Sequence, residues 1–593
     1  MFTLLSVFSY ALVVASGGAS ALSDTNCKCY PGDDCWPHAD VWAQLNETVG
    51  GRLVATIPLG SPCHDPHYDE GLCSSLRRRW HDPAVHHASP PSATTIDDEY
   101  CCSIASSSSL MVPLFANGSC DPFSPRNTAC EVGSYVRYAV DARDAHDVVA
   151  TIRFARKHNI RLVIRNTGHD FLGRSTGAGG LALRTQHLKE TRVLDWDDKR
   201  YVGKALRAGA GIWGFEANEA AKKAGLVVVT GECPTVGMAG GYIQGGGHST
   251  LSSAFGLGAD NTLSFEVVTP SGEIVTASPS NRHRDLYWAL SGGGGGNFGV
   301  VISVTVKAHP DVRVGGANFQ VTAPRGRDGD VMQHVWGALH SVLPTMVDAG
   351  LTLVYVAYGT SFRGVAVTGY NMTEAQVRLA MMPLEAAVKS KGLILQANFT
   401  EFPSYQQHAA HYFGTPSNDS FGVNNALFGG HLYPRSALAN LTEASREVNK
   451  KGGTLYGVAL DVSRFGAGSS NAVLPQWRQT IVHLAVSLPL MDGASMDYLK
   501  ERQHKMTYEL QPLLEAAAPG AGAYMNEADF QQPNFQEVFF GANYPRLMKI
   551  KRRYDGRGLL YVTAGVGSED WTVGQDGRMC RAHRLGTNSD RDA

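Results

Sequence analysis

The chain has 593 residues, of which 43% are apolar and 18% charged, a balance typical of a globular protein and not of a disordered one. The net charge of −2 removes the basic surplus expected of a nucleic-acid-binding protein. The 65 glycines show no collagen-like triplet period, but they cluster at 237–247 and 292–299. We therefore expect these two clusters to serve a local function of the backbone.

The N-terminus predicts entry into the secretory pathway. The apolar run 4–15, followed by Ala19-Ser20-Ala21, is typical of a signal peptide spanning residues 1–21 and cleaved near Ala21. This run is too short to cross a bilayer and no later stretch is longer and apolar, so no membrane span is expected. Six N-x-S/T sequons also favour secretion: Asn46, Asn117, Asn371, Asn398, Asn418 and Asn440.

Nine of the 11 cysteines lie before residue 131. In an oxidising compartment they predict a disulfide framework over 22–130, and because nine is odd, Cys580 is a candidate for the tenth partner. Cys233 is then left over in a Gly-rich stretch, either as a small buried thiol or as a reactive one. A zinc site made by Cys27, Cys29 and Cys35 with nearby histidines is disfavoured, because the spacing fits no tetrahedral template, so we expect no metal.

From residue 131 the pattern becomes that of a mixed α/β unit, which we bound at 131–311. Asp144 is the expected N-cap of a helix over 145–158. A second helix is expected near 212–224, and strands at 135–140, 161–165, 226–230, 263–269, 273–277 and 300–307.

Residues 312–520 carry longer strand-like runs with helices between them. Strands are expected at 351–358, 364–370, 427–433, 454–462 and 481–488, and helices at 374–390 and 436–450. This arrangement predicts an antiparallel sheet with one covered face. The segment 521–566 is again compact, and 567–593 is expected to be a loose tail.

Three glycine-rich loops, at 168–180, 237–247 and 292–299, predict a large phosphate-bearing ligand, because backbone N–H groups can converge on an anion there. The match of Gly294, Gly296 and Gly299 to a dinucleotide fingerprint fails, since a strand and not a helix follows. The Gly-x-Ser-x-Gly match around Ser175 also fails as a hydrolase elbow, since no helix directly follows it.

The remaining motifs occur in a fixed order along the chain. They are Arg165-Asn166-Thr167-Gly168-His169-Asp170, Gly231-Glu232-Cys233-Pro234-Thr235-Val236-Gly237, the run 240–248, Ala259-Asp260-Asn261, the run 285–299, and Tyr524-Met525-Asn526-Glu527-Ala528-Asp529. This set resembles the berberine bridge enzyme-like flavoproteins of the vanillyl alcohol oxidase superfamily, including secreted fungal members.

The resemblance, which is close over 131–311 and 521–566, implies an α+β fold. It implies an FAD-binding domain of two α/β subdomains, formed by 131–311 and the returning segment 521–566. A substrate domain, 312–520, would have a large antiparallel sheet covered by helices.

The resemblance also implies FAD attached covalently at two points, with His169 on the 8α carbon and Cys233 on C6 of the flavin. A neutral imidazole and a thiolate are suitable nucleophiles for these bonds, although a histidine that only hydrogen-bonds in the loop is the simpler alternative. The loop 166–170 with 245–249 would cradle the pyrophosphate, Asp260 with 292–299 would shape the other side, and Asn526 would approach the flavin ring. The remaining cofactor-binding residues are thus Asn166, Thr167, Gly168, Asp170, Val236, Gly237, Gly245, Gly246, Gly247, His248, Ser249, Asp260 and Asn526.

The implied reaction is hydride transfer to flavin N5 from an alcohol, a sugar or a secondary metabolite, which requires a group to take the hydroxyl proton. Glu527 and Asp461 are the first candidates, Asp461 on a strand expected to face the pocket, and Tyr524 is next; a solvated carboxylate is the simpler interpretation of both acids. Tyr355, Tyr358 and His431 are further strand candidates.

The sequence leaves alternatives open for the electron acceptor and for the class of function. Val236 occupies the position where relatives with valine are oxidases and relatives with leucine are dehydrogenases, which favours O2. An oxidative cyclase or dehydrogenase with another acceptor, and a secreted binding protein with a degenerate flavin site, remain open. The expected partners are a small-molecule substrate and O2, with no nucleic acid; the sequence gives no expectation for oligomeric state.

Overall fold

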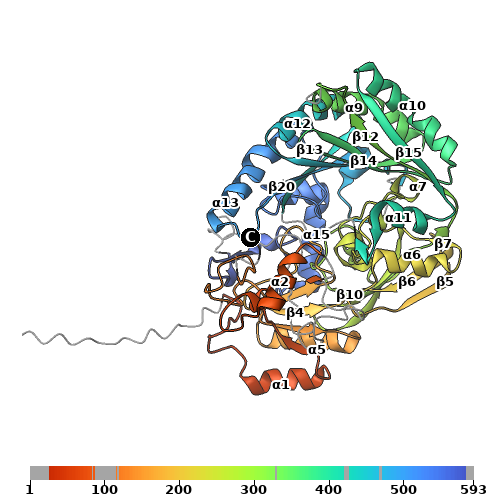
Figure 1. Ribbon diagram of the computed structural model, residues 1–593. Helices are drawn as coiled ribbons and strands as arrows, with labels where there is room; N and C mark the ends of the chain where they lie inside the picture. The colour runs from red at the N-terminus through yellow and green to blue at the C-terminus, as the bar shows by residue number, and fades with distance from the viewer. Residues whose placement is uncertain are drawn as a thin grey trace, which may run out of the picture.

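The structure is a computed structural model that describes residues 26–82, 85–86, 115, 119–326, 330–419, 426–465 and 471–582. The expected signal peptide, Cys101, Cys102 and Asn117 lie outside these residues. Three main sheets organise the chain, two below and one above in Figure 1.

The first sheet has four strands in the order β1-β2-β4-β3, and its members are β1 (Leu53–Ala55), β2 (Tyr138–Asp141), β4 (Leu181–Arg184) and β3 (Leu162–Arg165). Strands β2 and β3 both pair with β4 in parallel. Helix α5 (Ala145–Lys157) covers this sheet and begins where predicted, because the Asp144 side chain accepts the N–H of Asp147. Its expected apolar face, with Val148, Ile152 and Ala155, is buried.

The second sheet has five antiparallel strands in the order β5-β6-β10-β8-β9. They are β5 (Thr191–Asp197), β6 (Val202–Gly209), β10 (Val300–Lys307), β8 (Thr262–Val268) and β9 (Ile274–Ala277). Helices α6 (Gly214–Lys222) and α8 (Arg284–Leu290) belong to the same unit. The strand expected at 226–230 is shorter: β7 (Leu226–Val227) pairs only with β11 (His309–Pro310), after which the chain enters the loop that carries Cys233.

The third sheet has seven antiparallel strands in the order β15-β12-β14-β13-β19-β20-β18. They are β12 (Val314–Thr322), β13 (Leu351–Tyr358), β14 (Ser361–Tyr370), β15 (Ile394–Phe402), β18 (Ala426–Pro434), β19 (Thr454–Ala459) and β20 (Thr480–Pro489). Helices α9 (Asp330–Asp348), α10 (Glu374–Ser390), α12 (Leu438–Lys450) and α13 (Met496–Lys505) lie over its outer side (Figure 1). The predicted α+β fold, with a large helix-covered antiparallel sheet, is confirmed; β12, β15 and α9 were not predicted.

Four disulfides join described cysteines of the N-terminal region, and one of them reaches the other end of the chain. Cys27 pairs with Cys580, as the odd cysteine count suggested, and the other bonds are Cys29–Cys35, Cys63–Cys73 and Cys120–Cys130. The three cysteines considered as zinc ligands are therefore all in disulfides. This set of bonds is typical of an oxidising compartment.

The C-terminal segment returns to the first two sheets. Helix α15 (Tyr544–Asp555) packs against α8, and Lys551 within it donates hydrogen bonds to the carbonyl oxygens of Asn297 and Leu560. Within the described ranges, no helix combines the length and the apolar character needed to cross a bilayer.

Candidate functional site

A cavity of about 310 Å³ lies between the glycine-rich loops and the seven-stranded sheet. One wall comes from the loop after β3, the loop after β7, Gly295 and Gly296. The opposite wall comes from β13, β18, β19 and β20, and the segment around Tyr524 closes the site between them. Twelve of the predicted site residues line it: Asn166, Thr167, Gly168, His169, Asp170, Cys233, Val236, Gly237, His248, Tyr524, Asn526 and Glu527.

His169 and Cys233, which are far apart in the sequence, meet at one hydroxyl group. Nε2 of His169 lies 2.8 Å from Oγ1 of Thr235, and Sγ of Cys233 lies 3.5 Å from the same oxygen. Burial, with a smaller contribution from Arg165, lowers the pKa of His169 to about 4, so its imidazole is neutral at pH 7. Among the described cysteines, Cys233 alone takes part in no disulfide.

The loop that carries His169 is held by Asn166 and Asp170. Asn166 donates from Nδ2 to the carbonyl oxygen of Ala210 and to Oγ1 of Thr185. A Cβ on Gly237 would stand 1.6 Å from Oδ1 of Asn166, so only glycine permits this close approach. Oδ1 of Asp170 accepts the N–H of Arg174 at 2.6 Å, which closes the loop.

Arg174 joins this loop to the C-terminal segment. Its guanidinium donates to the carbonyl oxygens of Thr563 at 3.0 Å, Met525 at 3.4 Å and Ala564 at 3.4 Å. Burial lowers its pKa to about 10, against the opposing effect of Asp170, so it stays charged at pH 7. This clamp explains why two distant parts of the sequence act as one cofactor-side wall.

Glu527 is the centre of a buried ion-pair network. Its Oε1 lies 2.9 Å from Nε2 of His248 and its Oε2 lies 2.8 Å from Nε2 of His483, while Nδ1 of His248 lies 3.4 Å from Oε1 of Glu232. The Glu527 side chain is 27% exposed and lines the cavity, whereas His483 is 0% exposed and lies behind it. Glu527, Glu232 and His248 therefore all present their side chains to the cavity, whereas His483 does not line it.

Opposing effects set the charges in this network. Burial would raise the pKa of Glu527, but the charge of His248 and hydrogen bonds from both histidines hold it well below its usual value. Burial would lower the pKa of His248, but Glu232 and Glu527 raise it well above its usual value. We therefore describe Glu527 as ionised and His248 as protonated at neutral pH. The ligand atoms of His248, His483 and Glu527 lie within 4.8 Å of one another, but a protonated His248 has no lone pair with which to bind a metal ion.

Tyr524 and Asn526 lie beside this network. Nδ2 of Asn526 donates to Oη of Tyr524 at 2.9 Å and to the carbonyl oxygen of Gly241 at 2.8 Å. A Cβ on Gly245 would stand 2.4 Å from Nδ2 of Asn526, so this amide packs directly on the backbone. Burial, reinforced by the charge of Glu527, raises the pKa of Tyr524 well above its usual value, so the phenol stays neutral.

The sheet wall of the cavity is mainly apolar. It presents Val354, Phe428, Val458 and Ala485, together with Tyr456. Because side chains alternate along a strand, the neighbours of these residues point into the helix-covered core on the other face: Leu353, Tyr355, Leu427, Leu455, Leu484 and Val486.

The three further strand candidates for the catalytic base do not face the cavity, which corrects their proposed role. Tyr355 is fully buried against Trp336 of α9, on the face away from the cavity. Tyr358 is 45% exposed at the end of β13, and His431 contacts the carbonyl oxygen of Ala518 at 2.8 Å. None of the three lines the cavity.

Asp461 also lies away from the cavity, which corrects the expectation of a pocket-facing strand. Strand β19 ends at Ala459, and the Asp461 carboxylate accepts the N–H of Ser463 at 2.8 Å and pairs with Arg435 at 3.2 Å. Its charge is thus compensated outside the site.

Asp260 and the loop 245–249 have local roles in the structure. Asp260 forms two hydrogen bonds with Arg478, at 2.7 and 2.8 Å, and accepts one from Asn471. The N–H groups of Gly245, Gly246 and Ser249 donate to Gly241, Ile243 and Ser252, so they do not serve the cavity as an anion cradle. Neither these residues nor Gly247 line it.

Among the residues of the site that were not predicted are Glu232, Arg174, Tyr456 and His483. Glu232 stands next to Cys233 in the same motif, so its position could have been noticed. His483 and Tyr456 are isolated residues within strands. The face of the sheet on which each lies depends on the pairing register, and no sequence motif marks them.

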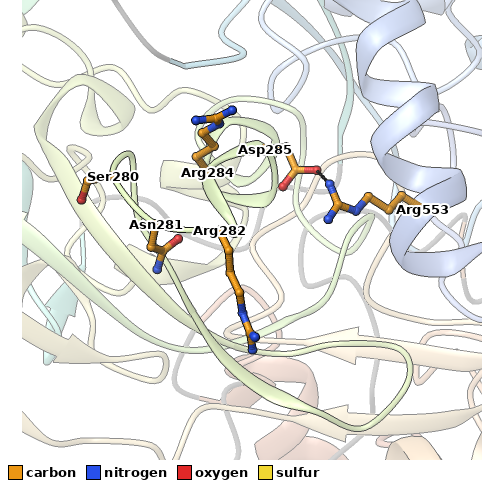
Figure 2. Close-up of a pocket in the computed structure, with 6 residues that line it drawn as sticks. All are labelled: Ser280, Asn281, Arg282, Arg284, Asp285 and Arg553. Atoms are coloured by element: carbon orange, nitrogen blue, oxygen red, sulfur yellow. Dashed lines mark hydrogen bonds and ion pairs between the residues drawn. The ribbon is translucent and has the colours of Figure 1, made fainter.

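A second cavity, of about 480 Å³, lies near α8 and α15, and Figure 2 shows Arg553 reaching from α15 to Asp285. The two side chains pair at 2.7 Å, next to Arg282 and Arg284. It contains none of the predicted site residues, so the first cavity remains the candidate active site.

The residues of the first cavity fit an FAD cofactor. A neutral buried imidazole and a thiol lie together at one end. The absence of a Cβ at Gly237 and Gly245 lets the side chains of Asn166 and Asn526, which line the cavity, pack directly on the backbone. The flat apolar sheet wall suits a stacked ring and an organic substrate.

Comparisons with known proteins agree with this geometry. Residues 136–278 match the FAD binding domain family and residues 523–567 match the berberine and berberine-like family. The chain is 47% identical to the FAD-linked oxidoreductase ZEB1 of Gibberella zeae, over 94% of this chain and 95% of that one. It is 44% identical to the FAD-linked oxidoreductase patO of Penicillium expansum, over 95% and 96%. The crystal structure of the VAO-type flavoprotein MtVAO615 from Myceliophthora thermophila superposes with a TM-score of 0.85 at 35% identity, over 94% and 100%.

Proposed function

Because the chain belongs to the FAD-linked oxidoreductases of the vanillyl alcohol oxidase and berberine bridge enzyme type, we propose that it is an oxidase that carries FAD on both His169 and Cys233. The observation that supports this most is the convergence of the two side chains on Thr235 at one end of the cavity. A protein with a degenerate flavin site would have no reason to keep both nucleophiles there.

The bound flavin would supply the hydride acceptor, and the chain would supply the base. We propose that Glu527 takes the hydroxyl proton of the substrate, with His483 holding the carboxylate from behind. A carboxylate with a lowered pKa is a weak base, but the hydroxyl becomes a strong acid once its carbon loses hydride, so a weak base is sufficient. Tyr524, kept neutral by its raised pKa, would bind the substrate oxygen and not take the proton.

The apolar wall would exclude water and bind the carbon frame of an alcohol, a sugar or a secondary metabolite. Phe171 and Phe428 face each other with ring centroids 3.9 Å apart at the cavity, next to Val354 and Val458. A hydrogen-peroxide assay against sugars, benzylic alcohols and polyketide alcohols identifies the class that is used.

O2 is the proposed acceptor because Val236, which is smaller than leucine by one methylene, lines the cavity beside Cys233. After photoreduction, the flavin is expected to reoxidise in air within a turnover and to release H2O2, and Val236→Leu is expected to slow this step. Reoxidation slower than turnover in the unchanged protein would favour the dehydrogenase or oxidative cyclase alternative.

We also propose that the protein is secreted. The four disulfides, and the signal-like segment 1–21, support this. Recovery of the chain from the culture medium, beginning near residue 22 and carrying glycans on its sequons, would test it.

The covalent links have a direct test. The purified protein should be yellow, and the colour should remain with the chain after acid precipitation. Mass spectrometry of peptides containing His169 and Cys233 should find flavin on both, and unmodified masses for both from coloured protein would refute the proposal.

A further inference from the structure

The hydroxyl of Thr235 is shared by the two predicted attachment residues but does not itself line the cavity. Thr235 is 2% exposed, behind His169 and Cys233, which both do line it. It is therefore placed to act on the flavin only through its two neighbours.

A threonine hydroxyl has one proton to donate and two lone pairs to accept with, so Thr235 can accept a hydrogen bond from His169 and donate one to Cys233 at the same time. If Nε2 of His169 donates to Oγ1, the hydroxyl donates onward to the sulfur of Cys233. The imidazole then carries its lone pair on Nδ1, and the sulfur is an acceptor, which is the role of a thiolate. In the opposite direction Nδ1 would hold the proton and the sulfur would be a thiol, so neither atom would be a nucleophile.

We propose that Thr235 is a positioning residue for flavin attachment, whose single hydroxyl selects the nucleophilic form of His169 and of Cys233 together. This inference rests on the proposed bicovalent attachment. Burial supports it, because the low pKa of about 4 leaves His169 uncharged, so hydrogen bonding and not protonation decides which ring nitrogen carries the lone pair.

Each of the two attachment steps forms one bond to the flavin and reduces the flavin by two electrons. At His169 a bond forms between Nδ1 and the 8α carbon; the carbon and Nε2 each lose a proton, and the electron pair of the broken C–H bond reduces the flavin. At Cys233 a bond forms between the thiolate and C6, which loses its hydrogen as a proton while an electron pair again passes to the flavin. After each step O2 takes two electrons and two protons from the flavin and leaves as H2O2.

The test compares Thr235→Val, which keeps the shape and removes the hydroxyl, with Thr235→Ser, which keeps the hydroxyl. The fraction of each peptide carrying flavin is measured by mass spectrometry in protein harvested at successive times. We expect attachment at His169 to slow roughly tenfold in Thr235→Val, which is the size of effect that one hydrogen bond has, and to recover in Thr235→Ser. Attachment at Cys233 should fall in the same variant.

Thr230→Val is the matched control. Thr230 is 3% exposed, lies in the same segment, and accepts a hydrogen bond from Asn218 at 2.9 Å, but it contacts neither nucleophile. Wild-type attachment in Thr230→Val, with slow attachment in Thr235→Val, supports the inference. Thr235→Ala keeps the test usable if the valine variant does not fold.

The possible failures are distinct. Attachment at His169 that is as fast in Thr235→Val and Thr235→Ala as in the unchanged chain overturns the role of Thr235 and leaves the proposed function intact. Absence of flavin from both peptides in the unchanged protein overturns the proposed function, and with it this inference.

Discussion

The two walls of the cavity are built in different ways. The cofactor-side wall consists of loops whose chemistry is written in short motifs, such as Arg165 to Asp170 and Gly231 to Gly237. The sheet wall consists of single residues taken from four strands, each next to a residue that faces the opposite core. A motif can be recognised in the sequence wherever its loop lies in the fold. The face of the sheet on which a strand residue lies depends on the pairing register, which the sequence motif does not give.

The largest effect is expected from a substitution of Glu527, which lies where the two walls meet. We expect Glu527→Gln to lower the rate of flavin reduction by substrate about 10³-fold, within the usual range for loss of a general base, while flavin attachment stays unchanged. Stopped-flow reduction of the flavin by a substrate found in the peroxide assay measures it.

Asp461→Asn is the matched comparison for that variant. Because Asp461 pairs with Arg435 outside the cavity, its change should leave flavin reduction within about twofold, as expected for a surface position. Equal losses in the two variants would mean that the ion-pair network does not identify the base.

The next effect separates the two faces of β19. Leu455 is fully buried under the helices, so Leu455→Ala should lower the free energy of unfolding by about 2–5 kcal/mol. Tyr456 is 36% exposed at the cavity, so Tyr456→Ala should cost less than about 1 kcal/mol. Denaturant unfolding of both variants gives the comparison, and a reversed order would mean that the strand is shifted by one residue.

The smallest expected effect is the pH dependence of stability from the Glu527–His248 pair. A lowered pKa makes Glu527 stabilising above its ordinary value of 4.5, and this contribution is lost as pH falls through the folded value. A raised pKa makes His248 stabilising below its ordinary value of 6.5, and this contribution is lost as pH rises through the folded value. Both are complete between pH 4.5 and 6.5.

The difference in Tm between the unchanged chain and Glu527→Gln should therefore be greatest in that window and should shrink on both sides. Glu443→Gln, which removes an exposed i,i+3 pair with Arg446, serves as the control and should give a nearly flat difference. A difference that kept growing above pH 8 would contradict the assigned charges.

The sequence allowed much of the cofactor-side wall to be predicted. The helix over 145–158 could be placed because Asp144 is a capping residue before an apolar periodicity, and the leftover Cys233 could be recognised by counting. The four-stranded sheet and its parallel pairing could not be predicted from local pattern, since β4 (Leu181–Arg184) follows a glycine loop without a distinct signal.

The sheet wall could not be predicted in the same way. Tyr355 and Val354 are adjacent and both apolar enough for a core, so nothing in the sequence says which one faces the cavity. Asp461 was misplaced for a related reason, because β19 ends at Ala459, three residues before the predicted end at residue 462. The two partners of Glu527 lie 279 and 44 residues away in the sequence, in a Gly-rich segment and in a strand, and only tertiary structure brings them together.

The bond between Cys27 and Cys580 makes a covalent ring of nearly the whole chain, since these residues are 553 positions apart. A protease that cuts once anywhere inside this ring leaves a single covalent molecule, heavier only by the water added in hydrolysis. The fragments would separate only after reduction, so a nicked population would stay invisible on a non-reducing gel. Because Cys580 is the last of the 11 cysteines in the sequence, the ring also closes only after nearly the whole chain has been synthesised.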